Sequence, residues 1–339
     1  MVQGNPCRWS AGRINPSYDV SRAHTPYRHN VSTISIENLT KRYPLVTALD
    51  ALTVEVPDGV CGLVGANGAG KSTLIKILLG LTEPTAGTAH VLGHNIATEG
   101  ERIRQNIGYM PEHDCLPPDV SAAEFVMHMA RVSGLPANAA RQRTADTLRH
   151  VGMFEERYRP MGGYSTGMKQ RVKLAQALAH DPKLVFLDEP TNGLDPTGRD
   201  EMLDLIRRVY TKFGISVLVT SHLLGELERT SDHVVVIEGG RLTRSESTKS
   251  LTSEHQTLIV EVLDPAGGNG TDTAMEALVG ADLAPRRVDQ LLYVPVTDSG
   301  TYDTIRDTVA GAGLGLVRLQ RDRHHMTELF TQGSPEHVS

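Results

Sequence analysis

Two patterns of hydrophobic and polar positions dominate the first two thirds of the chain. Thr33–Glu37 and Ala51–Val56 alternate apolar and polar residues, which is typical of half-buried strands. Short continuous apolar runs at Val60–Val64, Leu184–Leu187 and Ser216–Val219 predict strands that are buried on both faces. Segments with helical apolar spacing separate these runs. The alternation of strands and helices favours an α/β fold with a mostly parallel core sheet.

The helical segments are marked by apolar residues three and four positions apart. Ser72–Leu79 has this spacing, and residues 165–180 place Val172, Ala175, Leu178 and Ala179 on one face. Residues 120–150 predict two helices that are split by Gly134-Leu-Pro136. These segments lie between the predicted buried strands, as an α/β arrangement requires.

The pattern of apolar and polar positions changes after Gly239-Gly240. Strand patterns at 258–263, 291–296 and 315–319 alternate with helical patterns at 272–279 and 301–312, which predicts a small α+β domain over residues 256–331. Residues 1–31 are polar, with prolines and no sustained period, and we expect a disordered extension there. A regulatory tail and an overlong start of the reading frame both remain open for that segment.

Composition narrows the class of protein. Acidic residues outnumber basic ones, 40 to 34, for a net charge of −6, so general nucleic-acid binding is not expected. The three cysteines form no C-x-x-C pair, so neither a zinc site nor a disulfide framework is indicated. The chain has no apolar stretch near the ~18 residues of a membrane span and no signal-peptide core. We therefore expect a cytoplasmic protein whose role at a membrane, if any, requires another polypeptide.

A glycine-rich segment follows the first buried strand. Gly65-Ala-Asn-Gly-Ala-Gly-Lys71-Ser72 matches the pattern G-x-x-x-x-G-K-[ST] between a predicted strand and a predicted helix. Glycines let several backbone N–H groups approach one anion, and the positive end of the following helix points at the same place. Lys71 is placed to reach the β- and γ-phosphates of a nucleotide, and the Ser72 hydroxyl to bind Mg²⁺. The segment predicts a phosphate-binding loop.

Two further segments carry candidate chemistry. Asp188 and Glu189 directly follow the buried strand at 184–187, and the carboxyl ends of such strands form ligand sites in α/β sheets. We expect Asp188 to hold Mg²⁺ through its water, and Glu189 to polarise the attacking water as a general base. Ser165 and Gly167 open the helix at 165–180, where the helix N-terminus could bind an anion.

Taken together, these motifs resemble the ATP-binding cassette (ABC) ATPases. Tyr164-Ser-Thr-Gly-Met168 stands where that family has its signature LSGGQ, and Asn192-Gly-Leu-Asp195 is similar to its D-loop. Thr220-Ser-His222 is similar to its switch histidine, and the order of the motifs agrees with the family over roughly residues 33–250. The resemblance implies a P-loop NTPase fold with a mostly parallel core sheet, an antiparallel β subdomain and a helical subdomain at about 113–180. We therefore predict a cassette domain over residues 32–250.

The resemblance also assigns roles to individual residues. It implies that Tyr43 stacks on adenine, that His222 contacts the γ-phosphate, and that Asp195 lies at the nucleotide. Together with the phosphate-binding loop, the expected ATP-binding residues are Tyr43, Gly65, Ala66, Asn67, Gly68, Ala69, Gly70, Lys71, Ser72, Thr73, Ser165, Gly167 and Asp195. The expected catalytic residues are Glu189, His222 and Glu112, and the expected Mg²⁺ ligands are Ser72, Asp188 and Glu112.

Two residues depart from the family pattern. Glu112 follows Ile107-Gly-Tyr-Met-Pro111 at the position where the family has the Q-loop glutamine. A glutamate still offers Mg²⁺ a hard oxygen ligand, but it adds negative charge near the γ-phosphate, so we expect unusual hydrolysis or Mg²⁺ dependence. Thr166 replaces a glycine of the signature, where its side chain narrows the approach of a phosphate.

The resemblance implies partners as well as chemistry. Two cassettes of the family stack head to tail, so Ser165 and Gly167 would serve ATP bound by a second copy, identical or not. The form of the signature and the small C-terminal domain are similar to those of multidrug and antibiotic exporters, which implies a separate integral-membrane permease. The protein would then lie at the cytoplasmic face of the membrane. The alternative is a soluble ABC ATPase that acts in translation or DNA repair, although no second cassette and no heptad run is visible.

Overall fold

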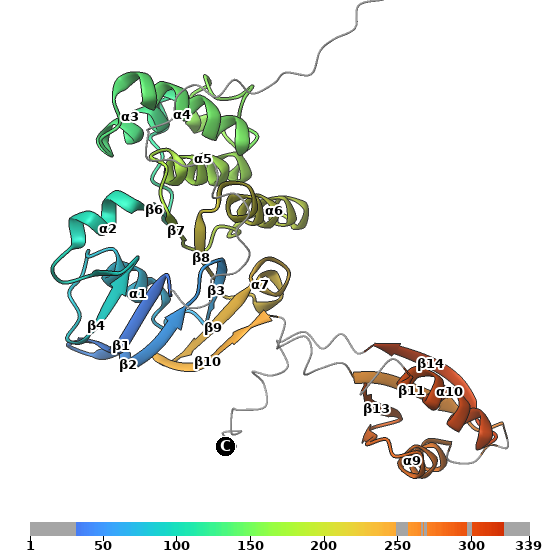
Figure 1. Cartoon of the computed structure of the whole chain (residues 1–339). Coiled ribbons are helices and arrows are strands. Elements are labelled where there is room, and N and C mark those ends of the chain that lie inside the picture. Colours follow the sequence, from blue (N-terminus) through green and yellow to red (C-terminus); the bar gives the residue numbers. More distant parts are fainter. Residues whose placement is uncertain (1–31, 249–256, 266, 268–269, 297–299, 322–339) are drawn as a thin grey trace, which may run out of the picture. The chain divides into compact units, whose positions relative to one another are not determined.

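The computed structural model describes residues 32–248, 257–265, 267, 270–296 and 300–321 (Figure 1). The expected disordered extension at 1–31 lies outside the described residues.

A largely parallel sheet forms the centre of the cassette. Its strand order is β10-β9-β3-β8-β7-β6, with bounds Arg241–Ser247, His233–Glu238, Val60–Val64, Ser216–Ser221, Leu184–Leu187 and Ile107–Met110. All neighbours pair in parallel except β10 and β9, which are antiparallel. The predicted parallel core sheet is therefore confirmed, with one antiparallel edge strand.

Both faces of this sheet are buried, and the sequence of each strand shows why. On β7, Val185 and Leu187 pack into one hydrophobic cluster, whereas Leu184 and Phe186 pack into another. Successive side chains of a strand point to opposite faces, so an unbroken apolar run fills a core on each side. This is the reason that the continuous apolar runs, rather than the alternating ones, mark the central strands.

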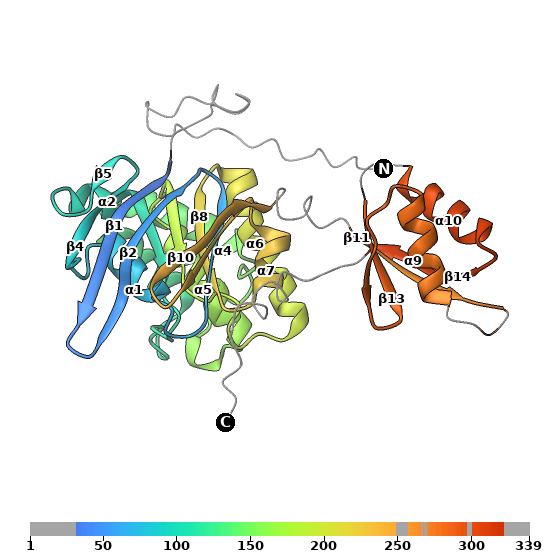
Figure 2. The ribbon, with the colours of Figure 1, turned by 90° about the horizontal axis from the view of Figure 1, so that it is seen from below.

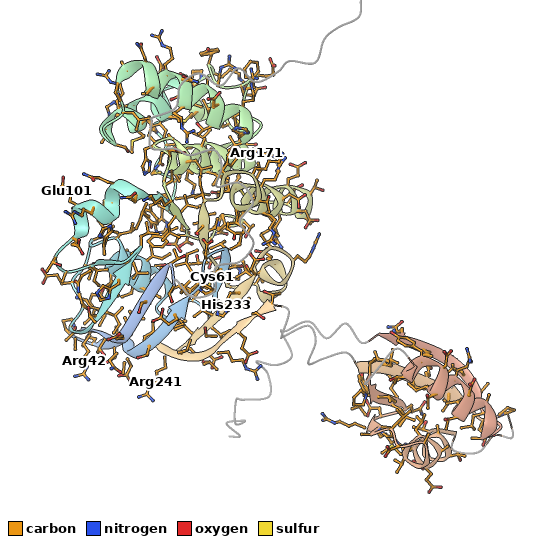
Figure 3. The ribbon with its side chains drawn as sticks, in the orientation of Figure 1. Arg42, Cys61, Glu101, Arg171, His233 and Arg241 are labelled. Atoms are coloured by element: carbon orange, nitrogen blue, oxygen red, sulfur yellow. The ribbon has the colours of Figure 1, made fainter. Side chains whose placement is uncertain are left out.

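A second sheet of the cassette is antiparallel, with the order β2-β1-β4-β5. Its strands span Val46–Val56, Ile34–Tyr43, Ala86–Val91 and His94–Asn95. Arg241 of β10, labelled in Figure 3, donates to Asp50 Oδ2 from Nε at 2.8 Å and from Nη2 at 2.6 Å, and so links the two sheets. This sheet agrees with the antiparallel β subdomain that the family resemblance implies.

Helices cover the rest of the cassette. They are α1 (Lys71–Leu78), α2 (Gly100–Asn106), α3 (Ala122–Val132), α4 (Ala137–His150), α5 (Thr166–Leu178), α6 (Pro196–Phe213) and α7 (Leu224–Thr230). The predicted break between two helices near residue 134 is confirmed, because Gly134 has a φ of +96° between α3 and α4. Figure 1 shows α3, α4 and α5 grouped together, with α5 nearest the six-stranded sheet. None of the described helices is long and apolar enough to cross a membrane.

The C-terminal part folds around its own core. Its elements are β11 (Thr257–Leu263), α9 (Gly270–Gly280), β12 (Arg286–Val288), β13 (Leu291–Pro295), α10 (Thr301–Gly311) and β14 (Gly315–Arg321). The strands form an antiparallel sheet of order β12-β13-β11-β14, and α9 and α10 pack with it around a shared cluster that includes Leu258, Leu292 and Ile305 (Figure 2). The sequence missed β12, because its three residues are all exposed and offer no apolar pattern.

Candidate nucleotide-binding site

The glycine-rich loop joins the end of β3 to the start of α1, and its glycines are required by close contacts. A Cβ on Gly65 would lie 2.4 Å from the Ile237 carbonyl oxygen, and one on Gly70 would lie 2.5 Å from that of Ala48. Gly70 also has a φ of +108°, which side chains disfavour. Gly68 differs, because it has a φ of +84° but open space around it. The loop therefore rests on its neighbours at both ends and is exposed at Ala66–Gly68.

Lys71 is the first residue of α1, and its side chain points back toward the glycine-rich loop. Its side chain is buried, and Nζ donates to the Gly65 carbonyl oxygen at 2.6 Å and approaches the Ala66 carbonyl oxygen at 3.4 Å. The same Nζ lies 3.4 Å from Oε1 of Glu189. The lysine thus joins the glycine-rich loop to the carboxylates at the end of β7. Ser72 and Thr73, the next residues of α1, are half-buried.

Thr220 of β8 holds both carboxylate residues that follow β7. Its hydroxyl donates to Asp188 Oδ1 at 2.8 Å and accepts a hydrogen bond from the backbone N–H of Glu189, also at 2.8 Å. Burial raises the pKa of the Asp188 carboxyl. The hydrogen bonds from Thr220 and Ser72 oppose that shift, and the charges of Glu112 and Glu189 add to it. Ser72 is therefore within hydrogen-bond reach of Asp188, and Glu112 acts on Asp188 through its charge.

Glu189 lies between Lys71 and His222. Its Oε2 is 2.9 Å from His222 Nδ1, and the histidine side chain is 45% exposed. Its Oε1 is buried and has no hydrogen-bond donor among the described residues, with Lys71 as the nearest cation. Glu189 also has a φ of +48°, an uncommon conformation for a residue with a side chain. A strained buried carboxylate with an unused acceptor is the kind of group that catalytic sites contain.

Glu112 lies two residues after the end of β6, the strand that pairs with β7. Its Oε1 accepts a hydrogen bond from Asn192 Nδ2 at 3.3 Å. Its charge contributes to the raised pKa of Asp188, which places the two carboxylates within electrostatic reach of each other. The parallel pairing of β6 with β7 therefore brings Glu112 near Asp188, which is followed by Glu189, the ion-pair partner of Lys71. In the described part of the chain, no three His, Cys, Asp or Glu side chains converge closely enough to hold a metal ion by themselves.

Four other predicted residues lie elsewhere. Ser165 is the N-cap of α5, where its side chain accepts from the Met168 N–H, and Gly167 lies in the first turn. Asp195 is the N-cap of α6 and accepts from the Gly198 N–H at 3.3 Å. Tyr43 ends β1, is 41% exposed, and has Lys41 Nζ 5.2 Å from its ring centre. Among the described residues, no hydrogen bond or ion pair joins these four to Lys71, Asp188 or Glu189.

Sequence reasoning gave no role of their own to three residues that contact the acidic residues of this site. Thr220 appeared only as part of the switch motif, and Asn192 only as part of the D-loop. Lys173 belongs to no motif, yet its amine donates to the carbonyl oxygens of Pro111 and Glu112 at 2.8 Å each. Each residue acts through a contact that is distant in sequence, and a buried lysine within a helix leaves no local signal.

A glycine-rich loop between a parallel strand and a helix, with carboxylates at the end of a neighbouring strand, defines a P-loop nucleotide-binding protein. Residues 49–192 match the family model described as ABC transporter. The chain is 39% identical over 225 residues to the uncharacterized ABC transporter ATP-binding protein YxlF of Bacillus subtilis (strain 168), covering 66% of this chain and 74% of the relative. The chain therefore belongs to the ABC transporter ATP-binding proteins, and membership of this family implies nucleotide binding.

Two further relatives are named for export or resistance. The Nod factor export ATP-binding protein I of Burkholderia orbicola (strain AU 1054) is 37% identical over 238 residues, which cover 70% of this chain and 78% of the relative. The daunorubicin resistance ATP-binding protein DrrA3 of Streptomyces coeruleorubidus is 34% identical over 269 residues, covering 79% of this chain and 84% of the relative. The predicted resemblance to exporter-type ATPases is thereby confirmed.

Solved structures confirm the fold class. The cbiO1 protein of Clostridium perfringens, part of the ABC transporter complex cbiONQ, superposes with a TM-score of 0.61 at 27% identity, covering 66% of this chain and 91% of that one. The ATP-binding cassette MJ0796, in a dimeric post-hydrolysis state bound to ADP and Pi, superposes with a TM-score of 0.58 at 22% identity, covering 63% and 98%. The second likeness concerns the fold alone.

Proposed function

We propose that this chain is the ATP-hydrolysing subunit of an exporter whose membrane-spanning permease is a separate polypeptide. The observation that carries this proposal is the arrangement of Lys71, Glu189 and His222 behind the glycine-rich loop. Lys71 Nζ lies 3.4 Å from one oxygen of Glu189, and His222 Nδ1 lies 2.9 Å from the other. Phosphoryl transfer depends on positioning and charge stabilisation, and a cation, a buried carboxylate and an imidazole supply both.

In this proposal the loop residues Gly65–Thr73 bind the phosphates of ATP, and Tyr43 stacks on the adenine. Ser72, Asp188 and Glu112 would hold Mg²⁺, which neutralises phosphate charge when bound. Hydroxyl and carboxylate oxygens are the ligands that Mg²⁺ prefers, and a cation would offset the burial that raises the Asp188 pKa. Because the described side chains do not enclose a metal by themselves, the nucleotide's own oxygens would complete the coordination.

Glu189 is the proposed general base. Its Oε1 accepts no hydrogen bond from the described residues and lies 3.4 Å from Lys71 Nζ, and in this proposal it takes a proton from water while His222 holds Oε2 in place. His222 is half-exposed, so it is also placed to contact a γ-phosphate that arrives from solvent. Both roles require only the side chains that this chain itself provides around Lys71.

The remaining site residues fit a dimer of cassettes. Ser165, Gly167 and Asp195 lie at the starts of α5 and α6, away from the hydrogen bonds and ion pairs of Lys71 and Glu189, so we propose that they complete the site of a second copy. The N-terminus of α5 offers free N–H groups and a positive dipole end to a phosphate. The dimeric state of the MJ0796 cassette supports this proposal.

We propose export as the direction of transport and the cytoplasmic face of the membrane as the location. The names of two relatives, a Nod factor export protein and a daunorubicin resistance protein, support export. A separate permease is supported by the cbiO1 protein, which is part of a transporter complex. No role in nucleic-acid binding is proposed, since the net charge is −6.

The replacement Glu189→Gln tests the proposal. It removes the proposed base while keeping the shape of the side chain, so we expect ATP to bind and hydrolysis to stop. Size-exclusion chromatography with saturating ATP and Mg²⁺ should then show a dimer that wild-type protein forms only transiently. The matched control is Glu37→Gln, which changes an exposed glutamate on β1 and should leave both elution and hydrolysis unchanged. A Glu189→Gln variant that binds ATP but stays monomeric contradicts the dimer, and one that hydrolyses ATP at the wild-type rate contradicts the base.

A further inference from the structure

Lys173 of α5 is a buried lysine whose amine faces backbone carbonyl oxygens of the segment after β6. The residue is only 3% exposed, and Nζ donates to the carbonyl oxygens of Pro111 and Glu112 at 2.8 Å, with that of His113 at 3.4 Å. The three N–H donors of the ammonium thus face three successive carbonyls. Burial lowers the pKa of Lys173, against the opposing effect of nearby acidic groups. A buried charge of this kind is tolerated only when hydrogen-bond acceptors with good geometry surround it.

Lys173 donates hydrogen bonds to the backbone segment that carries Glu112. The carboxylate of Glu112 is held separately, by the side-chain amide of Asn192 at 3.3 Å. The backbone carbonyl of Asn192 in turn accepts a hydrogen bond from Gln170 Nε2 at 3.1 Å. Gln170 and Lys173 are three residues apart on α5 and therefore lie on the same face of the helix. One helix thus fixes both the backbone of Glu112 and the partner of its carboxylate.

The position of the Glu112 carboxylate matters because of its neighbour Asp188. The Asp188 N–H donates to the carbonyl oxygen of Met110 at 2.9 Å, two residues before Glu112, and the charge of Glu112 is one of the causes that raise the pKa of Asp188. The attraction of two carboxylates for one divalent cation depends on their distances to it, as Coulomb's law requires. A small displacement of the Glu112 backbone would therefore change the cation affinity of the site.

We propose that Lys173 is a positioning residue that holds the Glu112 carboxylate beside Asp188 and thereby sets the Mg²⁺ affinity of the nucleotide-bound cassette. This inference rests on the proposed function, because it requires that the site bind ATP. Lys173 itself touches neither nucleotide nor metal. It acts through the carbonyl oxygens of the segment after β6.

The test uses the full chain, a fluorescent ATP analogue and Mg²⁺ titrations. For each variant, the dissociation constant of the analogue is measured in EDTA, and the Mg²⁺ concentration that gives half of the binding enhancement is measured afterwards. We expect Lys173→Met to raise that Mg²⁺ concentration about tenfold and to leave the dissociation constant in EDTA within about twofold. The expected direction is diagnostic. Loss of a positive charge near carboxylates would by itself tighten Mg²⁺ binding, whereas loss of positioning weakens it.

The matched control is Lys169→Met, one turn earlier on α5. Lys169 Nζ pairs with Asp114 Oδ2 at 2.7 Å, so the control removes an equal charge that contacts the same segment but not the Glu112 carbonyl. It should leave both measurements unchanged. In a Glu112→Gln background, Lys173→Met should add no further change in Mg²⁺ dependence, because the two residues act through one group.

The outcomes separate the inference from the proposed function. If wild-type protein does not bind the ATP analogue, the proposed function is wrong. If wild-type protein binds it with Mg²⁺ enhancement and Lys173→Met matches Lys169→Met or binds Mg²⁺ more tightly, only the positioning role is overturned. If circular dichroism shows that Lys173→Met does not fold, Lys173→Arg and Lys173→Gln take its place. The arginine keeps the charge and the donors, so it should raise the required Mg²⁺ concentration less than the glutamine does. An equal Mg²⁺ requirement in both replacements and in wild type would likewise reject the role.

Discussion

Thr220→Val removes one hydroxyl on which both carboxylate residues of the site depend. Thr220 is fully buried, and its hydroxyl donates to Asp188 Oδ1 and accepts from the Glu189 N–H. Losing a hydrogen bond to a carboxylate costs about 1.5–3 kcal/mol, and leaving a buried N–H without an acceptor costs about 1–3 kcal/mol. The methyl group that replaces the hydroxyl returns about 1 kcal/mol through burial. We therefore expect the free energy of unfolding to fall by about 1.5–5 kcal/mol.

Urea denaturation followed by far-ultraviolet circular dichroism, in EDTA at pH 7, measures this change. Thr211→Val is the control, because Thr211 is exposed on α6 and its hydroxyl bonds only to the Arg207 carbonyl within the same helix. The control should change stability by no more than about 0.5 kcal/mol. A loss below about 1 kcal/mol in Thr220→Val would refute the reasoning, since two buried polar groups would then have found other partners.

The pH dependence of the same variant provides a second check. The pKa of Asp188 is raised in the folded protein, so the folded state binds more protons than the unfolded state between the ordinary Asp pKa and the raised one. The contribution of Asp188 to stability therefore decreases as pH rises through that interval. The Thr220 hydrogen bond opposes the shift, and its removal raises the pKa further. The destabilisation by Thr220→Val should consequently be larger at pH 7 than at pH 4.5.

Three further predictions concern the loop, one helix and one buried histidine. Gly70→Ala should abolish ATP-analogue binding, because its Cβ would meet the Ala48 carbonyl at 2.5 Å, whereas Gly68→Ala, with open space, should cost only about 1 kcal/mol in thermal unfolding. Ser121→Ala removes the capping box of α3 and should lower stability to urea by about 0.5–2 kcal/mol. Burial lowers the pKa of His180, so the contribution of the neutral histidine to stability is present above pH 6.5 and is lost as pH falls. The His180→Gln variant should therefore lose less stability than wild type between pH 7 and pH 5, as measured by urea denaturation.

The fold was predictable where each strand carries its own signal. The apolar runs of β3, β7 and β8 are buried on both faces and are bounded by turns, so each could be located from a few neighbouring residues. The strand β12 could not be located, because Arg286–Val288 is exposed and pairs only with β13. Its existence depends on the partner strand rather than on its own residues.

The site was predictable for a related reason. Lys71, Asp188 and Glu189 belong to contiguous motifs whose spacing reflects local geometry. The supporting contacts are not local. Thr220 bonds to Asp188 across 32 residues, Lys173 to the Glu112 carbonyl across 61, and Asn192 to the Glu112 side chain across 80. Only the parallel pairing of β6, β7 and β8 brings these segments together, so a single sequence does not reveal them.

The charges at the site connect nucleotide binding to cation binding. Glu189 lies between the buried Lys71 and the half-exposed His222, and it follows Asp188, whose pKa is raised in part by the charges of Glu112 and Glu189. On the proposed assignment, the phosphates of ATP would add further negative charge, which favours binding of the nucleotide together with Mg²⁺. Linked binding is reciprocal, so the factor by which Mg²⁺ tightens the nucleotide must equal the factor by which the nucleotide tightens Mg²⁺. Because Glu112 carries a charge that glutamine lacks, Glu112→Gln should lower this shared factor, and an unchanged factor in calorimetric titrations of the nucleotide with and without Mg²⁺ would contradict the role of Glu112.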